Sequence, residues 1–338
     1  MTAFEGYKIL EIFSPWPKSE TTFKYALVDK QSPIKINLNY NNFDGIIPVP
    51  VDDIVVTSTT HLPALELLEE TASLIGFPGT TYVSLPKIRT RIDSGEIREL
   101  GKNEGINTEV LLELRPDVLI AFGIDGNNSA FETITNAKIP VIYNGDWVEE
   151  SPLAKAEWIK LFGVLYDKEV KADSVFKAIE AGYISARELA KSVKNRPTVL
   201  SGAMHKDVWY LPSGTSPEGQ LLKDANVDYL WASTAASGSL ALNFETVFTK
   251  AQSADLWFNP SYYPSYEALE DANSHYGTFK AFKSKNIFTV STTTGATGGV
   301  LYYEKGLSRP DLVLKDLIKI AHPELLQEYQ LSFFKPLQ

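Results

Sequence analysis

Hydrophobic and polar residues follow two different rhythms along the chain, and each rhythm predicts a different kind of element. The first 45 residues alternate apolar and polar positions, as in YKILEIF and FKYALV, with a turn rich in Pro, Lys and Ser between them. This alternation predicts a β-hairpin. From Val51 onward, short apolar runs alternate with segments of helical periodicity. That second rhythm predicts a parallel sheet covered by helices.

Several elements of the second rhythm have recognisable ends. The run DIVVTS predicts a buried strand, and an amphipathic helix is expected from Leu62 to Ile75. Asn107 is a capping residue for a helix that runs through Leu114 and precedes the strand DVLIAFG. A helix from Ser129 to Asn136 precedes the strand PVIYN, and residues 153–166 predict a further helix.

A long helix divides the chain into two similar halves. From Lys168 to Lys194 apolar residues recur at steps of three and four, and no proline occurs until Pro197. After it the alternation of strands and helices restarts with TVLSG, VWYL and NIFTVS, and helices are expected over 217–226 and 310–321. We therefore expect two α/β lobes joined by one long helix.

The two halves also repeat short phrases. NTEVLLELRPDVLIAF, which begins at Asn107, is matched by NFETVFTKAQSADLWF, which begins at Asn243. Each phrase has Asn, a glutamate two positions later, a helical segment, and Asp before an apolar run. VVTSTTH and VLSGAMH form a second pair, in which a buried strand leads into a polar turn and ends at His61 or His205.

These phrases resemble those of the substrate-binding proteins that serve type II ABC importers of iron–siderophore complexes, haem and vitamin B12. NTEVLLELRPDVLIAFG is similar to that family's N-lobe signature, and SPEGQLLKDANVDYLW to its C-lobe segment. RPDLVLKDLIKIAHPELL resembles the C-terminal helix of a Bacteroidetes-like branch. The resemblance covers about residues 50–335. It implies the class III periplasmic-binding-protein fold, with two Rossmann-like lobes, parallel sheets and one long α-helix between them, here with an added N-terminal β-hairpin.

The expected divisions follow from this plan. Residues 1–48 form the hairpin extension, 49–167 the N-terminal α/β lobe, 168–194 the linker helix and 195–338 the C-terminal α/β lobe. The resemblance implies a periplasmic protein, lipid-anchored in a full-length precursor whose leader is absent from this sequence. It would be a monomer without a cofactor that binds a small-molecule metal chelate between its lobes. The expected ligand is a ferric siderophore, and cobalamin or haem are the alternatives.

The repeated glutamates have a role in this family. By resemblance, Glu109 and Glu245 dock into arginine pockets on the two subunits of an inner-membrane ABC permease dimer. An exposed carboxylate in the first turn of a helix is favourable there and can accept two hydrogen bonds from arginine. The same pattern is also ordinary capping chemistry, in which Asn satisfies free N–H groups and Glu interacts with the helix dipole.

If the lobes face each other, ligand residues should lie on the loops at the carboxyl ends of the strands. Aromatic walls suit a large chelate, and Arg89, Arg91 and Lys206 favour an anionic one. Each residue also has a structural interpretation, as core, rim or solvated helix. An imidazole can bind iron or cobalt, but His61 and His205 are weak metal candidates and no direct metal site is expected. The candidates are Thr59, Thr60, His61, Tyr82, Arg89, Arg91, Trp147, His205, Trp209, Tyr210, Trp231, Tyr302 and Tyr303.

Composition narrows the classes of function. A net charge of −10 and a pI near 5.1 argue against nucleic acid and anionic membrane surfaces as partners. No apolar run approaches the roughly 18 residues that span a bilayer, so no membrane insertion of the folded domain is expected.

There is no Cys and only 4 His, which argues against a bare-metal site. No P-loop, nucleophile elbow or H-E-x-x-H motif occurs, and a carrier is expected. A chelatase-like or hydrolytic enzyme on the same two-lobed fold is the alternative.

Overall fold

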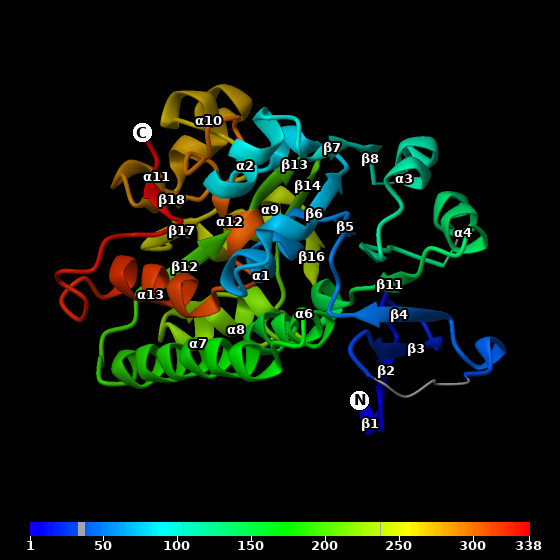
Figure 1. The fold of residues 1–338 in the computed structure, drawn as a ribbon. Coiled ribbons are helices and arrows are strands. Elements are labelled where there is room, and N and C mark those ends of the chain that lie inside the picture. Colours follow the sequence, from blue (N-terminus) through cyan, green and yellow to red (C-terminus); the bar gives the residue numbers. More distant parts are fainter. Residues whose placement is uncertain (33–37, 104, 127, 237) are drawn as a thin grey trace. The chain divides into compact units, whose positions relative to one another are not determined.

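A computed structural model describes residues 1–32, 38–103, 105–126, 128–236 and 238–338. The chain divides into two compact units. Unit 1 contains Met1–Glu149, Glu157–Phe176 and Ala296–Gly299, and unit 2 contains Glu150–Ala156, Lys177–Gly295 and Val300–Gln338. Each unit is built around its own mostly parallel sheet (Figure 1). The two α/β lobes predicted from the sequence are therefore confirmed.

The sheet of unit 1 has the strand order β11-β10-β5-β6-β7, and every neighbouring pair is parallel. Its central strands are fully buried apolar runs, as expected for a sheet covered on both faces. The strands are β5 (Ile54–Val56), β6 (Leu74–Phe77), β7 (Arg98–Glu99), β10 (Val118–Ala121) and β11 (Val141–Tyr143).

Helices and short turns surround this sheet. Helices α3 (Thr108–Leu114) and α4 (Ser129–Asn136) have the bounds that the sequence predicted, and they share a core cluster with β5 and β10. The remaining elements are η2 (Thr59–His61), α1 (Leu62–Leu67), η3 (Thr71–Ser73), η4 (Thr80–Tyr82), α2 (Pro86–Asp93), β8 (Gly101–Lys102), β9 (Gly105–Ile106), η5 (Asp146–Val148) and α6 (Ile159–Leu165).

Two predicted helices are shorter than expected. The helix predicted from Leu62 to Ile75 ends at Leu67, and Glu69 adopts a positive φ of 62°. The apolar residues from Leu74 onward form strand β6, because a short apolar run fits a buried strand as well as a helix face. The helix predicted over 153–166 is divided at Trp158 into α5 (Pro152–Glu157) and α6.

The N-terminal hairpin is confirmed and belongs to a larger sheet. Strands β2 (Tyr7–Phe13) and β3 (Thr22–Asp29) pair antiparallel, β1 (Thr2–Phe4) joins β2, and β4 (Gly45–Val49) runs parallel to β3. A short helical turn, η1 (Tyr40–Asn42), precedes β4.

This small sheet packs directly on the edge strand β11 of unit 1. The Tyr25 hydroxyl donates to the backbone oxygen of Val141 at 2.8 Å. The rings of Trp16 and Phe23 lie 5.2 and 4.8 Å from the ring of Tyr143, between centroids. The sheet is therefore part of the core of unit 1.

The long helix is confirmed as α7 (Glu169–Ala190), which begins in unit 1 and ends in unit 2. Its predicted apolar stripe is buried at Ala172, Phe176, Ile179, Tyr183, Ala186 and Ala190. It ends four residues before Lys194, where the predicted helix ended.

Unit 2 contains two sheets. The larger one has the order β15-β12-β17-β18-β19, and all pairs are parallel except the last. A smaller antiparallel sheet of β13, β14 and β16 was not predicted. The bounds are β12 (Thr198–Ser201), β13 (Ala203–His205), β14 (Val208–Pro212), β15 (Asp228–Tyr229), β16 (Ser239–Leu242), β17 (Leu256–Phe258), β18 (Ile287–Thr289) and β19 (Lys335–Pro336).

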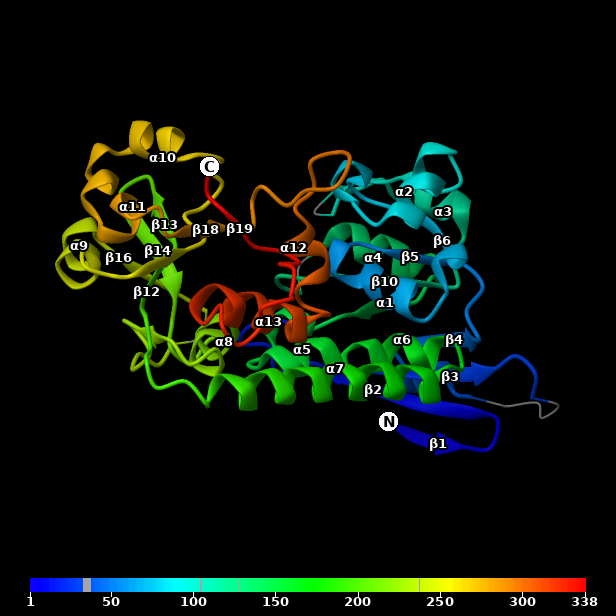
Figure 2. The ribbon, with the colours of Figure 1, turned by 90° about the vertical axis from the view of Figure 1, so that its left-hand side faces the viewer.

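The helices of unit 2 include a packed pair, α8 (Pro217–Asp224) and α13 (Pro310–Ala321) (Figure 2). The buried carboxylate of Asp316 on α13 accepts hydrogen bonds from the backbone N–H groups of Ser332, Phe333 and Phe334 at 2.7–3.0 Å. These bonds fix the C-terminal segment beside α13. The other helices are α9 (Phe244–Ala251), α10 (Tyr266–Ala272), η6 (Ser274–Thr278), α11 (Lys280–Lys283) and α12 (Leu301–Lys305).

Candidate ligand-binding site

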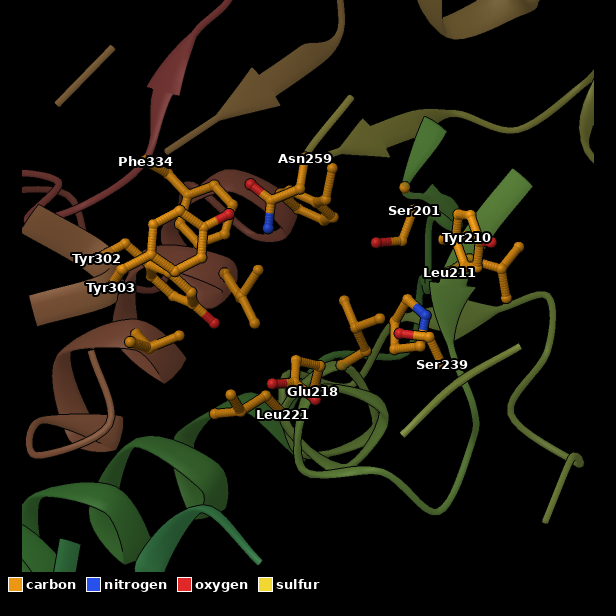
Figure 3. A pocket seen from close by; sticks show the side chains of 16 residues that line it. Ser201, Tyr210, Leu211, Glu218, Leu221, Ser239, Asn259, Tyr302, Tyr303 and Phe334 are labelled. Carbon is orange, nitrogen blue, oxygen red and sulfur yellow. The ribbon is translucent and has the colours of Figure 1, made fainter. Parts of the chain in front are cut away.

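A cavity of about 300 Å³ opens at the carboxyl ends of strands β12 and β17 in unit 2 (Figure 3). Carboxyl ends of parallel strands are where ligands bind in open α/β sheets. Helices α8, α12 and α13 and strands β14 and β16 complete its wall. The lining residues are Ser201, Gly202, Tyr210, Leu211, Pro212, Glu218, Leu221, Leu222, Ser239, Phe258, Asn259, Tyr302, Tyr303, Val313, Leu317 and Phe334.

The strand ends supply polar groups to this cavity. Ser201 is the last residue of β12, and its hydroxyl points into the space (Figure 3). Asn259 directly follows β17 and adopts a positive φ of 50°, which asparagine tolerates. Its backbone N–H donates to Phe288 at 2.8 Å and its side-chain oxygen accepts from Val290 at 3.3 Å. Its amide nitrogen is thereby directed towards the cavity (Figure 3).

Aromatic residues form the opposite wall. Tyr302, Tyr303 and Phe334 lie together in Figure 3, and the rings of Tyr302 and Phe334 are 6.1 Å apart. Burial raises the pKa of both tyrosines, and the negative charge of Glu218 raises it further. A hydrogen bond with Tyr262 also raises the pKa of Tyr303. Both phenols are therefore neutral and can donate hydrogen bonds to a ligand.

Glu218 supplies a carboxylate at the rim of the cavity. It lies in the first turn of α8, where the side chain of Ser216 caps the helix by accepting from the N–H of Gly219 at 3.1 Å. Glu218 is exposed. Among the described residues that line the cavity, it is the one charged group.

The carboxyl ends of the strands in unit 1 carry a second polar cluster. After β5, the Ser58 hydroxyl caps η2 and lies 2.9 Å from the Thr60 hydroxyl. The Thr60 hydroxyl donates to the carboxylate of Asp146 at 3.2 Å. Asp146 follows β11 and is 4% exposed. Next to it, the ring of Trp147 lies 5.5 Å from that of Phe122. Thr59, Thr60 and Trp147, all predicted ligand residues, are thus brought together in unit 1.

A family of known proteins matches most of the chain. The family model described as periplasmic binding protein matches residues 54–292, well over half of the 338 residues. The chain belongs to the periplasmic binding protein family. This membership confirms the family that the repeated phrases indicated.

Individual relatives of this periplasmic binding protein agree with the assignment. An uncharacterized lipoprotein of Methanocaldococcus jannaschii is 27% identical over 330 residues, which is 92% of this chain and 75% of the relative. A possible iron-binding periplasmic solute-binding protein of Staphylococcus epidermidis has a TM-score of 0.63 at 16% identity, over 81% of this chain and 99% of its own. The petrobactin-binding protein of Bacillus subtilis has a TM-score of 0.61 at 14% identity, over 96% and 100%. At such identities the structures establish the class III fold.

The two histidines predicted as a matched pair occupy different environments. His61 is 1% exposed on η2, its ring lies 6.3 Å from that of Phe162, and burial lowers its pKa to about 3. Neither of its ring nitrogens has a hydrogen-bond partner among the described residues. His205 is exposed at the end of strand β13. The difference arises because the chain forms a helical turn after β5 and a strand after β12.

The predicted arginines are held by their own unit. Arg89 donates to the backbone oxygen of Thr80 at 2.7 Å and pairs with Asp93 at 2.7 Å. Arg91 donates to the backbone oxygen of Leu74 at 3.0 Å and pairs with Glu96 at 2.9 Å. Leu74 begins β6, so the Arg91 guanidinium lies at the amino end of that strand, opposite the edge where ligands are expected.

The predicted aromatic residues separate into two groups. Tyr210, Tyr302 and Tyr303 line the cavity. Trp209 is fully buried, and its indole N–H donates to the backbone oxygen of Ser201 at 3.0 Å. Trp231 is 4% exposed in the same core. Neither tryptophan is among the described cavity residues, because both side chains point inward and pack in the hydrophobic core of unit 2. Tyr82 is 70% exposed in unit 1.

The two repeated glutamates have closely similar surroundings in this periplasmic binding protein. Asn107 caps α3 by accepting from the N–H of Val110 at 3.1 Å, and Asn243 caps α9 by accepting from Thr246 at 2.8 Å. Glu109 and Glu245 are each exposed in the first turn of the capped helix. The capping interpretation therefore holds for the asparagines and leaves both carboxylates exposed.

Sequence reasoning missed several residues of the cavity. Ser201 ends the apolar strand β12, and Asn259 directly follows the apolar strand β17. Asp146 of the polar cluster in unit 1 likewise comes after β11. Ligands bind at the carboxyl ends of parallel strands, so this rule could have identified all three residues. Glu218 lies in the phrase SPEGQLL, which indicated fold only. Phe334 comes from the C-terminal segment and had no signal in the sequence.

The described residues contain no group of three or more His, Asp or Glu that could hold a metal ion. Over the same part of the chain, no helix has the length and apolar character needed to cross a bilayer.

Proposed function

We propose that this protein is the solute-binding component of an ABC importer, which binds a ferric siderophore and delivers it unchanged to a membrane permease. The observation that carries the proposal is the cavity of unit 2, where neutral phenols, hydroxyls, an amide and an apolar floor surround about 300 Å³. Such a mixture is typical of sites that hold an organic ligand by shape and a few hydrogen bonds. The relatives named for iron or petrobactin binding support an iron chelate as the cargo.

The lining favours an intact chelate over a bare ion. A bare metal ion requires several convergent carboxylates or imidazoles, whereas the described residues of the cavity contribute one carboxylate and no imidazole. Rings such as Tyr302, Tyr303 and Phe334 can pack against the organic part of a chelate. Cobalamin and haem are bound by the same family and are the alternative cargoes.

A titration of the full chain tests the proposal. Isothermal calorimetry would compare a ferric trishydroxamate, a ferric tris-catecholate, cyanocobalamin and haemin. One ligand binding at one per protein with micromolar or tighter affinity is expected. Tyr303→Ala should weaken it about tenfold or more, whereas Phe13→Ala, a 67% exposed residue of the N-terminal sheet, should not. Absence of binding across the panel would overturn the proposal.

Delivery to the permease would use Glu109 and Glu245. Both carboxylates are exposed in the first turn of a helix, one in each unit. Replacing both by Ala should abolish ligand uptake in cells that carry the importer and leave ligand affinity unchanged. Glu113→Ala, at another exposed glutamate of α3, is the matched control. A loss of affinity in the double variant would place the two residues in the binding site and contradict docking.

A periplasmic location and a lipid anchor in the precursor are supported by the family and by the relative named as a lipoprotein.

Binding without turnover predicts that the ligand is recovered unaltered, which mass spectrometry of the released chelate can check. A modified or demetallated product would favour the enzyme alternative.

A further inference from the structure

We propose that the binding site accepts neutral or cationic metal chelates and rejects anionic ones, and that Glu218 is the residue that imposes this selection. The inference rests on the proposed function for the presence of a chelate. It goes further by assigning the charge class of that chelate and reverses the preference that Arg89, Arg91 and Lys206 suggested from the sequence.

The charge of the cavity wall disfavours an anionic ligand. Of the 16 described residues that line it, only Glu218 carries a charge, and none is basic. Ser201, Ser239 and Asn259 offer neutral hydrogen-bonding groups. An anion that leaves water for such a site loses its hydration without gaining a cationic partner, which is costly. A cationic ligand gains the carboxylate as its partner.

Tyr302 and Tyr303 of the cavity wall are protonated and add no charge to it. A protonated phenol donates a hydrogen bond to a ligand oxygen and adds no charge to the site. The pKa values of Tyr302 and Tyr303 are raised, first by burial. The two rings therefore provide polar contacts that a neutral hydroxamate can use, and the charge of the wall is that of Glu218 alone.

The basic residues that the sequence suggested are not among the described residues of the cavity. The guanidinium of Arg89 is paired with Asp93, and that of Arg91 lies at the amino end of β6. Lys206 is exposed in the turn between β13 and β14. Lys155 shares a separate, smaller hollow with Glu218 but is not among the residues of the cavity. No basic residue is therefore among the described residues that line the cavity itself.

The net charge of the chain has the same sign as Glu218. The chain as a whole carries a net charge of −10. This overall charge also disfavours the approach of an anion.

Three iron complexes separate charge from shape. Ferrioxamine B carries one free ammonium group, its N-acetyl derivative is neutral with the same trishydroxamate centre, and a ferric tris-catecholate is strongly anionic. Calorimetry with the full chain would measure each complex against the parent, Glu218→Gln and a control. Glu267→Gln is matched, because Glu267 is also an exposed glutamate in the first turn of a Ser-capped helix, α10.

The expected result is a preference for ferrioxamine B over its acetylated form in the parent and weak or absent binding of the tris-catecholate. Glu218→Gln should reduce the preference between the two trishydroxamates about tenfold, the size of a single charge pair near a protein surface. The preference should also shrink as salt is added. Glu267→Gln should behave as the parent.

Two outcomes would contradict the inference in different ways. If the parent binds the tris-catecholate most tightly, or if Glu218→Gln leaves the ratio of the two trishydroxamates unchanged, the charge selection is wrong while the carrier function stands. If the parent binds none of the three complexes, nor cobalamin or haemin, the proposed function itself fails and the selection fails with it.

Discussion

Strands β5 and β12 are followed by turns that differ at one decisive residue, which is Ser58 after β5 and Gly202 after β12. The two turns lead to different structures. Thr57 and Ser58 follow β5, and the Ser58 hydroxyl caps the turn that opens into α1. At the corresponding positions of unit 2, Ser201 is followed by Gly202 with a φ of 77°, and the chain reverses into the hairpin of β13 and β14. A capping serine starts a helix, whereas a left-handed glycine permits a sharp turn.

This difference decides what each unit offers at its binding edge. In unit 1 the helical turn places His61 in the core and leaves Thr60 beside Asp146. In unit 2 the hairpin brings Tyr210 and Leu211 over the end of β12, where they line the cavity. Two strands of like sequence therefore yield a compact polar cluster in one unit and a cavity in the other.

The largest effect is expected from Gly202→Ala. A Cβ atom at this position would lie 1.8 Å from the backbone oxygen of Tyr210. The left-handed backbone and the clash together should lower the free energy of unfolding by about 3–4 kcal/mol. Calorimetric unfolding would measure it. Gly238→Ala is the control, because Gly238 has a φ of 85° but nothing within 4 Å of the added atom. An equal loss in both variants would show that backbone conformation alone is responsible.

A smaller effect is expected from His61 as the pH falls. Burial lowers the pKa of folded His61 to about 3 from its ordinary 6.5. Below pH 6.5 the unfolded chain therefore binds a proton that the folded chain does not, and stability falls as the pH drops towards 3. At pH 5 the loss relative to pH 7 is about 2 kcal/mol.

His61→Leu should remove this part of the pH dependence, which urea unfolding between pH 7 and pH 5 can follow. The matched control is His205→Leu, at the exposed histidine of unit 2. A profile that is unchanged in His61→Leu would mean that the imidazole is not desolvated as the structure shows.

The smallest effect is expected at Ser58, the residue that corresponds to Gly202. Ser58→Ala removes the cap of η2 and should cost about 1 kcal/mol, whereas Ser58→Gly should cost only a few tenths. Thermal unfolding of the two variants gives the comparison. If alanine is tolerated as well as glycine, the side-chain cap does not determine the path of the chain after β5.

Most of the fold could be predicted because its elements have local signals. Asparagine caps and the Pro-Asp step defined α3 and β10, and the regular apolar stripe defined α7. The strand β6 was missed because Leu74 and Ile75 continue the helical pattern of apolar residues. In the structure the helix has already ended before Glu69, which adopts a positive φ. The hairpin of β13 and β14 depends on Gly202, whose conformation no periodicity reveals.

The site could be predicted only in part, for a different reason. Tyr210, Tyr302 and Tyr303 stand out as aromatic residues near strand ends or helix starts, and they do line the cavity. Trp209 has the same appearance in the sequence, but its indole donates within the core. Arg91 was predicted for its charge, and its contacts lie at the amino edge of the sheet of unit 1. Phe334 reaches the cavity through the hydrogen bonds of Asp316, a long-range contact that local patterns do not contain.

The N-terminal sheet also bears on how such a protein could evolve. Residues matched by the family model begin at position 54, after this sheet. Yet Gly126 faces the ring of Trp16, and Gly45 of this sheet faces Pro140, at distances that leave little room for a side chain. Loss of the sheet would uncover Tyr143, and a side chain larger than that of glycine at position 126 would crowd Trp16. We therefore expect the sheet and the glycine that accommodates it to be inherited together.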